Sequence, residues 1–406
     1  MKHVFNTRHG DYVLASRIAM GGMGEVFLAL DAENPDRFVA LKVLHAHLHD
    51  EPKVVEMFYR EARLGALFRH RNLVRVYSAG VIRARHSMVM EFAPGVTLRQ
   101  LLDRLEERGE TFPTFFVLDT MRQLAEALGY AHRLTGADGE PLGVVHRDLS
   151  PDNVLIGFDG VVRLLDFGVA AAATSANELG LAGKIAYMSP EQCRGEPLDA
   201  RADLYALGTL YWEMLQGRAA YPRTDRILAL RAITEEGLPP PAASSGRELA
   251  TDLDGLWERL HTKYPRDRVG DASRLVLALD ALIQKLDAPP HEPMGGWVQR
   301  LFPHESEELR TVCEKILRAP APTENTVDLD YDSFSLSSDV PSKREVKPPP
   351  APVSIGADTA EVDHIQLSPT EYTSVRQIRR RRIQRNLFLF VAVALLAALI
   401  LFLVLP

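Results

Sequence analysis

Cysteine is scarce in this chain, with two residues among 406, Cys193 and Cys313. Two cysteines are too few for a disulfide framework, and they fit a reducing compartment. Residues 1–14, MKHVFNTRHGDYVL, contain no apolar run of the length that a secretory signal needs. We therefore expect the folded part of the chain to lie in the cytoplasm.

Basic residues are not in excess either, because 47 Lys and Arg stand against 54 Asp and Glu, which gives a formal net charge of −7. This balance provides no overall attraction to nucleic acid, and we expect no nucleic-acid partner. The basic residues are unevenly placed, however, and six arginines lie within residues 376–385, RQIRRRRIQR.

One long apolar run follows this basic segment, the nineteen residues 387–405, LFLFVAVALLAALILFLVL. As a helix it would be roughly 28 Å long, close to the hydrocarbon thickness of a bilayer. A buried core helix is the alternative, but such a helix normally keeps a polar stripe, which this segment lacks. Because arginine-rich flanks stay on the cytoplasmic side, we predict a single-pass anchor in the inner membrane, with the preceding chain in the cytoplasm.

Residues 288–386 lean toward Pro, Ser, Asp and Glu and are predicted to form a disordered low-complexity linker. Such a composition cannot bury enough apolar surface to offset the entropy of ordering. An island at residues 295–318 interrupts the linker, because apolar residues recur there at helical spacing. We expect a pair of short helices docked on the main domain, with a partner-binding motif as the alternative.

Residues 12–44 indicate a hairpin-rich start. The run YVLASRIAMGGMGEVFLAL gives two β-compatible stretches around a glycine cluster, and RFVALKVL adds a third strand that carries Lys42. Glycines such as Gly21, Gly22 and Gly24 let backbone N–H groups approach phosphate oxygens. A glycine-rich turn alone is weak evidence, since most such turns are ordinary hairpins.

Residues 52–68, PKVVEMFYREARLGALF, have the pattern of an amphipathic helix. Glu61 on this helix is the best candidate partner for Lys42, because an ion pair between them would hold the ammonium against nucleotide phosphates. Two solvated surface charges are the alternative.

Polar residues with a shared chemistry gather in VVHRDLSPDN, residues 144–153, and in DFG, residues 166–168. The run VLIGFDGVVRLL between them predicts a hairpin with an Asp-Gly turn. A loop and a hairpin would thus bring together two carboxylates and an amide, which suit a magnesium nucleotide. Asp166 and Asn153 would bind Mg²⁺, or Mn²⁺, through hard oxygens, while Asp148 would orient an acceptor hydroxyl and take its proton.

The ordered set of Lys42, Glu61, HRD at 146–148, Asn153 and DFG resembles the eukaryotic-type (Hanks-type) Ser/Thr protein kinases, and most closely their bacterial branch, over residues 10–287. SPE at 189–191, Asp203 in DLYALG and Arg268 in YPRDRV match further family positions, and the family pairs this arginine with the glutamate of SPE. The resemblance implies an α+β bilobal fold, with a β-rich N-lobe at about 10–93 and a mostly helical C-lobe at about 94–287.

The resemblance also implies roles for individual residues. Met90 would lie at the back of the adenine pocket, and the backbone of Glu91 to Ala93 would form the hinge. Arg147 would interact with the activation loop when that loop is phosphorylated. The residues expected to contact ATP are Ala19, Gly21, Gly22, Gly24, Val26, Ala40, Lys42, Met90, Glu91 and Ala93.

Besides Ser189, which stands where the family usually has alanine, three positions depart from the family pattern. Ala19 replaces the first glycine of the phosphate loop, and Ser150 replaces a lysine that faces the transferred phosphate. The family threonine two residues before Ala186 is replaced by Lys184. We therefore hypothesise an exchange, in which Lys184 steadies the γ-phosphate and Asp148 while Ser150 hydrogen-bonds nearby. In the alternative, Lys184 is a solvated loop charge and the kinase is weakened.

These features predict a membrane-anchored Ser/Thr protein kinase that phosphorylates proteins, including itself through self-association of tethered copies. Thr174 and Ser175 are the candidate autophosphorylation sites in the activation loop. A small-molecule phosphotransferase fits less well, because it usually lacks both DFG and SPE. The remaining alternative is a catalytically weak kinase-like scaffold that binds nucleotide and partner proteins at the membrane.

Overall fold

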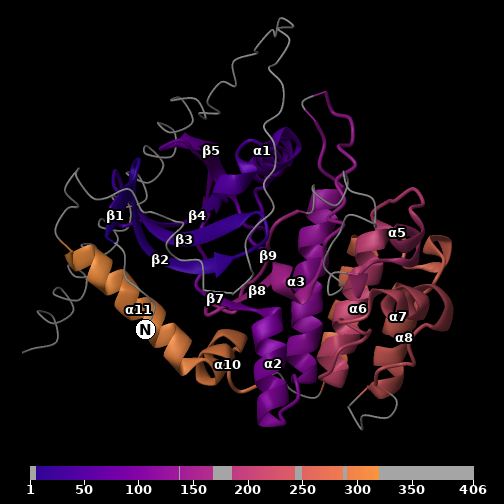
Figure 1. Ribbon diagram of the computed structural model, residues 1–406. Coiled ribbons are helices and arrows are strands. Elements are labelled where there is room, and N and C mark those ends of the chain that lie inside the picture. Colours follow the sequence, from indigo (N-terminus) through magenta and orange to yellow (C-terminus); the bar gives the residue numbers. More distant parts are fainter. Residues whose placement is uncertain (1–5, 137, 168–184, 243–248, 287–289, 320–406) are drawn as a thin grey trace, which may run out of the picture. The chain divides into compact units, whose positions relative to one another are not determined.

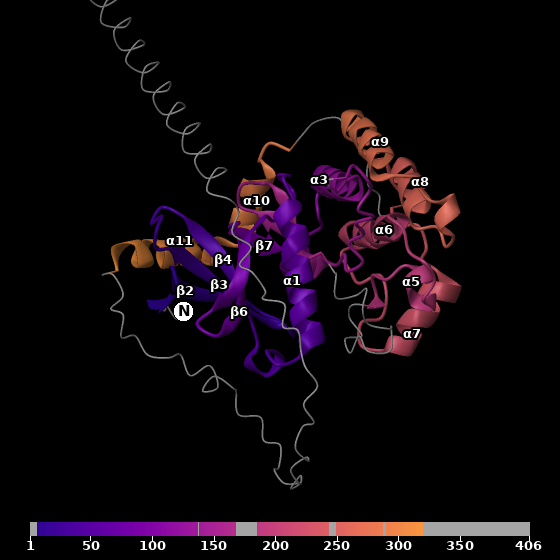
Figure 2. The same cartoon turned by 90° about the horizontal axis from the view of Figure 1, so that it is seen from above.

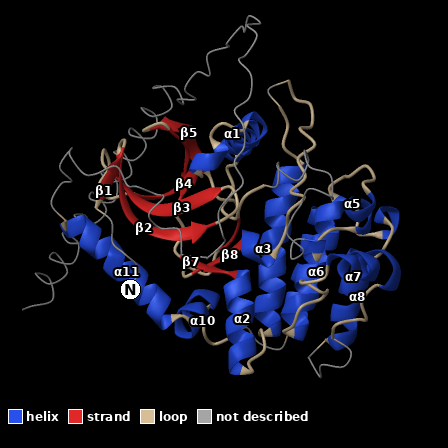
Figure 3. Cartoon of the chain, viewed as in Figure 1, coloured by secondary structure: helices blue, strands red, loops and turns tan. Residues whose placement is uncertain are grey.

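The computed structural model describes residues 6–136, 138–167, 185–242, 249–286 and 290–319, and these form two lobes (Figure 1). Most strands belong to the first lobe and most helices to the second, as the colouring by secondary structure shows (Figure 3). This is the bilobal α+β arrangement that the sequence predicts.

The N-lobe is built on a six-stranded antiparallel sheet in the order β1-β2-β3-β4-β6-β5. Its strands are β1 (Thr7–His9), β2 (Tyr12–Met20), β3 (Gly24–Asp31), β4 (Phe38–Leu44), β5 (Val76–Ile82) and β6 (Arg85–Glu91). Helix α1 (Pro52–Leu67) begins at a proline, whose missing N–H is no loss in the first turn. Its residues Phe58 and Ala62 pack with Ala40 and Met88 of the sheet, so one face of the sheet supports α1.

The C-lobe surrounds one large apolar core. Its helices are α2 (Leu98–Arg108), α3 (Thr114–His132), α5 (Pro190–Arg194), α6 (Arg201–Gln216), α7 (Arg226–Arg231), α8 (Ala250–Leu260) and α9 (Ala272–Lys285). Helix α6 is buried at every residue from Ala202 to Leu215. It therefore has no solvent-facing polar stripe, and its polar residues Asp203, Thr209 and Glu213 are buried together with the apolar ones.

A small three-stranded sheet, β7 (Gly95–Thr97), β8 (Val154–Gly157) and β9 (Val162–Leu164), lies beside the junction of the lobes. The β8–β9 hairpin is the one predicted from the Asp-Gly turn. Shorter helical turns are η1 (Ala46–Leu48), η2 (Pro151–Asn153), η4 (Ala232–Glu236) and η5 (Pro265–Asp267).

The island predicted at 295–318 forms two helices, α10 (Met294–Leu301) and α11 (Pro303–Arg318). Helix α10 contacts β8 and helix α11 contacts β2, and both views place α11 along the sheet (Figures 1 and 2). The packed region therefore continues to residue 319, past the linker boundary near residue 287 that composition suggests.

Among the residues that the structure describes, no helix is long and apolar enough to cross a membrane. The expected span at 387–405, the arginine-rich segment at 376–385 and the linker beyond residue 319 lie outside the described residues.

Candidate active site

Lys42 on β4 meets two carboxylates from distant parts of the chain. Its Nζ lies 2.7 Å from Oε1 of Glu61 on α1 and 3.0 Å from Oδ2 of Asp166, which follows β9. The predicted pair with Glu61 is therefore present, and Asp166 joins it. Lys42 is buried, whereas the Asp166 side chain is 43% exposed. One ammonium faces two carboxylates, and of these two the Asp166 carboxylate lies on the solvent side.

The electrostatics of this group keep the lysine charged. Burial would lower the pKa of Lys42, but the carboxylates of Asp166 and Glu61 outweigh burial and raise that pKa. Burial raises the pKa of Glu61, and the charge of Asp166 adds to this effect. Partial loss of water around the Asp166 carboxylate would raise its pKa, although the side chain is 43% exposed, yet the Lys42 ammonium holds that pKa below its ordinary value. Asp166 is therefore the carboxylate that stays ionised and accessible.

Asp148 and Asn153 are in direct contact in the loop before β8. Nδ2 of Asn153 donates to the Asp148 backbone oxygen at 2.7 Å and to Oδ2 of Asp148 at 3.1 Å. Because the amide nitrogen faces Asp148, the amide oxygen of Asn153 points elsewhere and can serve a cation.

This loop is held in place by Asp203, a buried carboxylate on α6. Its Oδ2 accepts the backbone N–H of His146 at 2.8 Å, and its Oδ1 accepts that of Arg147 at 2.9 Å. Nε2 of His132 also lies 2.8 Å from Oδ2. Burial would raise the pKa of Asp203, but the hydrogen bond from His132 and the neighbouring histidines hold it low, so the loop keeps a charged acceptor.

Arg147 has φ of 65°, in the left-handed region that residues other than glycine rarely adopt. Its peptide is fixed on both sides, because Asp203 accepts its N–H and Nε2 of Gln192 donates to its carbonyl at 2.9 Å. Such strained conformations persist only where the surroundings determine them, and they cluster at active sites.

Phe167 fixes the direction of Asp166. Its ring lies 4.6 Å from the ring of Phe68, just after α1, and 4.6 Å from that of His146. Nε2 of His146 lies 3.0 Å from the Leu165 backbone oxygen. The residue after Asp166 is thus packed between the two lobes, which directs the Asp166 carboxylate toward Lys42.

The glycine-rich turn joins β2 and β3. The Gly21 N–H donates to the Gly24 oxygen at 2.9 Å and closes the hairpin. A Cβ at Gly24 would collide with the Val43 carbonyl, whereas one at Gly22 would meet nothing within 4 Å. Only Gly24 is therefore required by packing. Ala19 pairs with Val26 within the sheet, directly after an irregularity in the register between Arg17 and Ala19, so the alanine is accommodated in the strand.

Apolar residues lie beside this turn. Ala40 and Met90 face each other on β4 and β6 and are buried. Val26, Ile18 and Phe92 pack against the same cluster. The predicted adenine-contacting residues of the strands thus belong to one apolar group, next to the predicted hinge at Glu91–Ala93.

The pair expected between Glu191 and Arg268 is present and buried. Nη1 and Nη2 of Arg268 donate to the two carboxylate oxygens of Glu191 at 2.6 Å and 2.7 Å. Ser189 caps α5 in a reciprocal arrangement with Gln192, the residue that also holds Arg147. The start of α5 is thereby tied to the catalytic loop.

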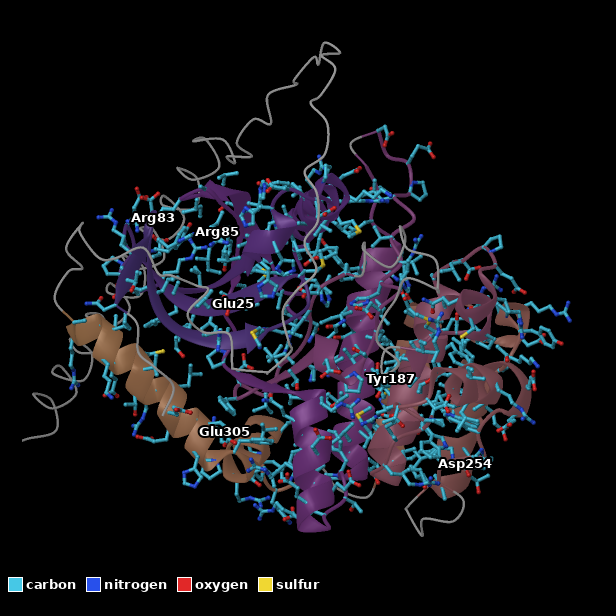
Figure 4. All side chains as sticks on the ribbon, in the orientation of Figure 1. Glu25, Arg83, Arg85, Tyr187, Asp254 and Glu305 are labelled. Carbon is cyan, nitrogen blue, oxygen red and sulfur yellow. The ribbon has the colours of Figure 1, made fainter. Side chains whose placement is uncertain are left out.

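A second buried network has no signal in the local sequence. The hydroxyl of Tyr187 donates to Oε2 of Glu213 at 2.9 Å and accepts from Arg99 at 2.5 Å. Figure 4 labels Tyr187 among the C-lobe helices. His132 was likewise missed, because its partner Asp203 is 71 residues away and nothing in the local pattern connects them.

Four predicted residues, Gly168, Thr174, Ser175 and Lys184, lie outside the described residues. The exchange between Lys184 and Ser150 therefore stays a prediction. Ser150 itself is 4% exposed and lies between Asp148 and Asn153.

Comparison with known proteins places this geometry in a family. Residues 12–279 match the family described as protein kinase domain. Tyrosine-protein kinase MasK of Myxococcus xanthus is 35% identical over 307 residues, which are 73% of this chain and 47% of MasK. Serine/threonine-protein kinase PknL of Mycobacterium bovis is 35% identical over 291 residues, 68% of this chain and 67% of PknL.

The chain spans 39% of a further relative, serine/threonine-protein kinase Pkn1 of Myxococcus xanthus, at 34% identity. Among solved structures, the Mycobacterium tuberculosis PknI kinase domain has a TM-score of 0.53 at 25% identity, covering 68% of this chain and 97% of that domain. The chain belongs to the protein kinase domain family.

Proposed function

We propose that this chain is an ATP-dependent protein kinase that transfers the γ-phosphate of ATP to Ser and Thr hydroxyls of proteins. The observation that carries the proposal is the meeting of Lys42 and Glu61 with Asp166 across the two lobes. Phosphoryl transfer is catalysed almost entirely by positioning and electrostatic stabilisation, which an oriented ammonium and fixed carboxylates can supply.

The donor set fits a nucleotide with Mg²⁺ or Mn²⁺. Asp166 and the amide oxygen of Asn153 are hard oxygen ligands, and Asp166 is partly exposed. When bound, the metal neutralises charge on the phosphate groups. Lys42, oriented by Glu61, would hold the phosphates, and Asp148 would orient the acceptor hydroxyl and receive its proton. The apolar cluster around Ala40 and Met90 would receive the adenine ring.

The acceptor class is proposed as Ser and Thr because PknL and Pkn1 are named serine/threonine kinases. MasK is named a tyrosine kinase, so the acceptor needs its own test. Phosphoamino-acid analysis of the labelled products should give phosphoserine or phosphothreonine. Phosphotyrosine as the sole product would overturn this assignment.

The full chain should phosphorylate itself or a generic protein acceptor when given labelled ATP and Mg²⁺. Asp148→Asn and Asp166→Ala should each remove nearly all transfer. Asp152→Asn is the matched control, because Asp152 lies in the same loop but its side chain is 67% exposed. A wild-type chain that binds ATP and transfers nothing would support the scaffold alternative.

We further propose membrane anchoring through residues 387–405, which the apolar run and the adjoining arginines support. Deleting residues 387–406 should move the protein to the soluble fraction with its kinase activity retained. Attraction of the arginines to anionic lipid, about 1 kcal/mol per residue, should disappear at high salt. Salt-resistant membrane association of the deleted form would show that the anchor lies elsewhere.

Anchoring would concentrate copies of the chain, and we propose that they phosphorylate one another at Thr174 or Ser175. Mass spectrometry of the fully active protein should find a phosphate on one of these residues. Full activity with neither residue modified would contradict the proposed sites.

A further inference from the structure

Helices α10 and α11, which we call the strap, contact both lobes. Helix α10 is anchored on the C-lobe, where the Trp297 ring lies 5.2 Å from that of Phe112 and 5.1 Å from that of Phe116. Nε2 of Gln299 donates to the Phe158 backbone oxygen at 2.9 Å. These contacts hold the first half of the strap to α3 and to the β8–β9 hairpin.

The junction between the two helices is held by Arg104 of α2. Its guanidinium donates to the Leu301 oxygen at 2.8 Å and to Oε1 of Glu305 at 2.9 Å. It also lies 4.5 Å from the centre of the Phe302 ring. Figure 4 labels Glu305 in the first turn of α11. The point where the strap leaves the C-lobe is thus fixed by three interactions of one side chain.

Helix α11 then covers part of the N-lobe sheet. Val312 and Ile316 are each 4% exposed and share an apolar cluster with residues of two strands. The strand residues are Val13 and Ala15 of β2 and Leu28 and Leu30 of β3. Burial of this face removes apolar surface of both the helix and the sheet from water.

Two residues connect this cluster to the nucleotide site. Ile18 and Phe92 pack against the cluster of Val312 and Ile316, and they also pack against the cluster that contains Ala40 and Met90. Ile18 immediately precedes the phosphate loop, and Phe92 lies in the predicted hinge. The side chains that border the proposed adenine site are therefore supported from outside by α11.

We propose that the strap is a built-in positioning element for the nucleotide, which holds Ile18 and Phe92 in place and fixes one lobe against the other. Nucleotide binding between two lobes requires that their hinge and walls keep the productive geometry. An element that contacts both lobes and the hinge residue Phe92 restrains the hinge and also the walls of the nucleotide site. The strap lies outside residues 12–279, which match the family, and the inference rests on the proposed nucleotide site.

The test compares two neighbouring residues of α11 in the full chain. Ile316→Ser removes an apolar side chain from the cluster, while Leu317→Ser makes the same change at a position that is 52% exposed. The readouts are the Kd of a fluorescent ATP analogue, and KM for ATP and kcat with a protein acceptor. Ile316→Ser should weaken ATP binding by about tenfold, which corresponds to about 1.4 kcal/mol, with a smaller change in kcat. Leu317→Ser should match the wild type, and Ile316→Val should recover most of the affinity.

Equal ATP affinity of Ile316→Ser and Leu317→Ser would overturn the proposal. If Ile316→Ser does not fold, Arg104→Gln decides, because Arg104 is partly exposed and its loss leaves the apolar face of α11 intact. A folded Arg104→Gln chain with weakened ATP binding supports the strap, and one with unchanged binding contradicts it. Since the Kd is measured without turnover, it can also be determined in the Asp148→Asn background, so absence of kinase activity in the wild type would refute the function and leave this test intact.

Discussion

The two lobes bury their apolar residues in different ways. The C-lobe has one continuous core, whereas the N-lobe has three smaller clusters divided by its sheet, one of them completed by α11. The C-lobe core fixes Asp148 through Asp203 on the fully buried α6. Lys42 and Glu61 instead depend on the small clusters beneath α1. The loop that carries Asp148 is thus held by the large C-lobe core. The Lys42–Glu61 pair is held by smaller clusters, so its position can change more easily.

The largest effect should come from the C-lobe frame. Arg268→Ala leaves Glu191 buried without its partner, which should lower the free energy of unfolding by about 3–5 kcal/mol. Arg201→Ala is the control, because its pair with Asp199 is exposed and should contribute less than about 1 kcal/mol. Urea denaturation measures both. Similar small losses in the two variants would mean that the C-lobe is less rigid than its core suggests.

The next effect concerns the proposed exchange in the cleft. Lys184→Thr should reduce kcat by on the order of 10² to 10³, since a cationic clamp on the transferring phosphoryl group is lost. Adding Ser150→Lys should restore much of the activity, because a rigid C-lobe would hold positions 150 and 184 in place, so that the ammonium and the hydroxyl can be exchanged between them. An unchanged kcat in Lys184→Thr, or no rescue by the second substitution, would identify Ser150 as a mark of a weakened kinase.

A pH effect should distinguish the lobes, because each contains a buried histidine whose pKa is lowered. Burial, with Arg268 nearby, lowers the pKa of His261 to about 3, and burial with Arg83 and Arg85 lowers that of His9 to about 4. As the pH falls below about 6.5, the ordinary pKa of histidine, these histidines therefore become protonated in the unfolded chain but stay neutral in the folded chain. The contribution of each histidine to the free energy of unfolding is fully present above about pH 6.5. As the pH falls from there to the pKa of the folded state, it is lost by up to about 1.4 kcal/mol per pH unit for each histidine.

Denaturation at about pH 7.5 and about pH 5.5 tests this difference. His261→Gln should flatten the pH dependence of the C-lobe transition, and His9→Gln should flatten that of the N-lobe transition, if the lobes unfold separately. A variant whose pH dependence equals that of the wild type would show that its histidine is protonated in the folded lobe.

The smallest effect should come from the contact between α1 and β6. The Tyr59 hydroxyl lies 2.8 Å from Nδ1 of His86. Tyr59→Phe should lower the free energy of unfolding by about 0.5–1.5 kcal/mol. It should also raise KM for ATP modestly, because α1 carries Glu61. A loss as large as that of Arg268→Ala would show that the N-lobe is as tightly framed as the C-lobe.

The sequence predicted most of what depends on local pattern. Alternating apolar residues gave the strands around the glycine turn, and helical periodicity gave α1 and the pair α10 and α11. Motif spacing identified Lys42, Glu61 and Asp166, because each stands at a fixed place in its own segment. These three residues carry the group that the structure brings together.

Contacts between distant segments could not be predicted in the same way. The bond of His132 to Asp203 and the network of Tyr187 with Glu213 join helices that only the folded core brings together. Composition places α10 and α11 within a linker region, and only the helical spacing of their apolar residues predicts the docked pair that the structure shows. Packing, and not the propensity of the segment itself, decided where the folded region ends.

The meeting of two glycines has a consequence for reading related sequences. Gly160, in the Asp-Gly turn with φ of 77°, faces Gly295 near the start of α10, and a Cβ on Gly295 would collide with the Phe158 carbonyl. Glycine inside a helix costs about 1 kcal/mol relative to alanine. A glycine in the first turn of an otherwise ordinary helix therefore indicates that another backbone segment packs closely against that turn. A GG pair some 135 residues beyond an FDG turn (160 to 295 in this chain) could be searched for in other chains as the signature of the same docked helix.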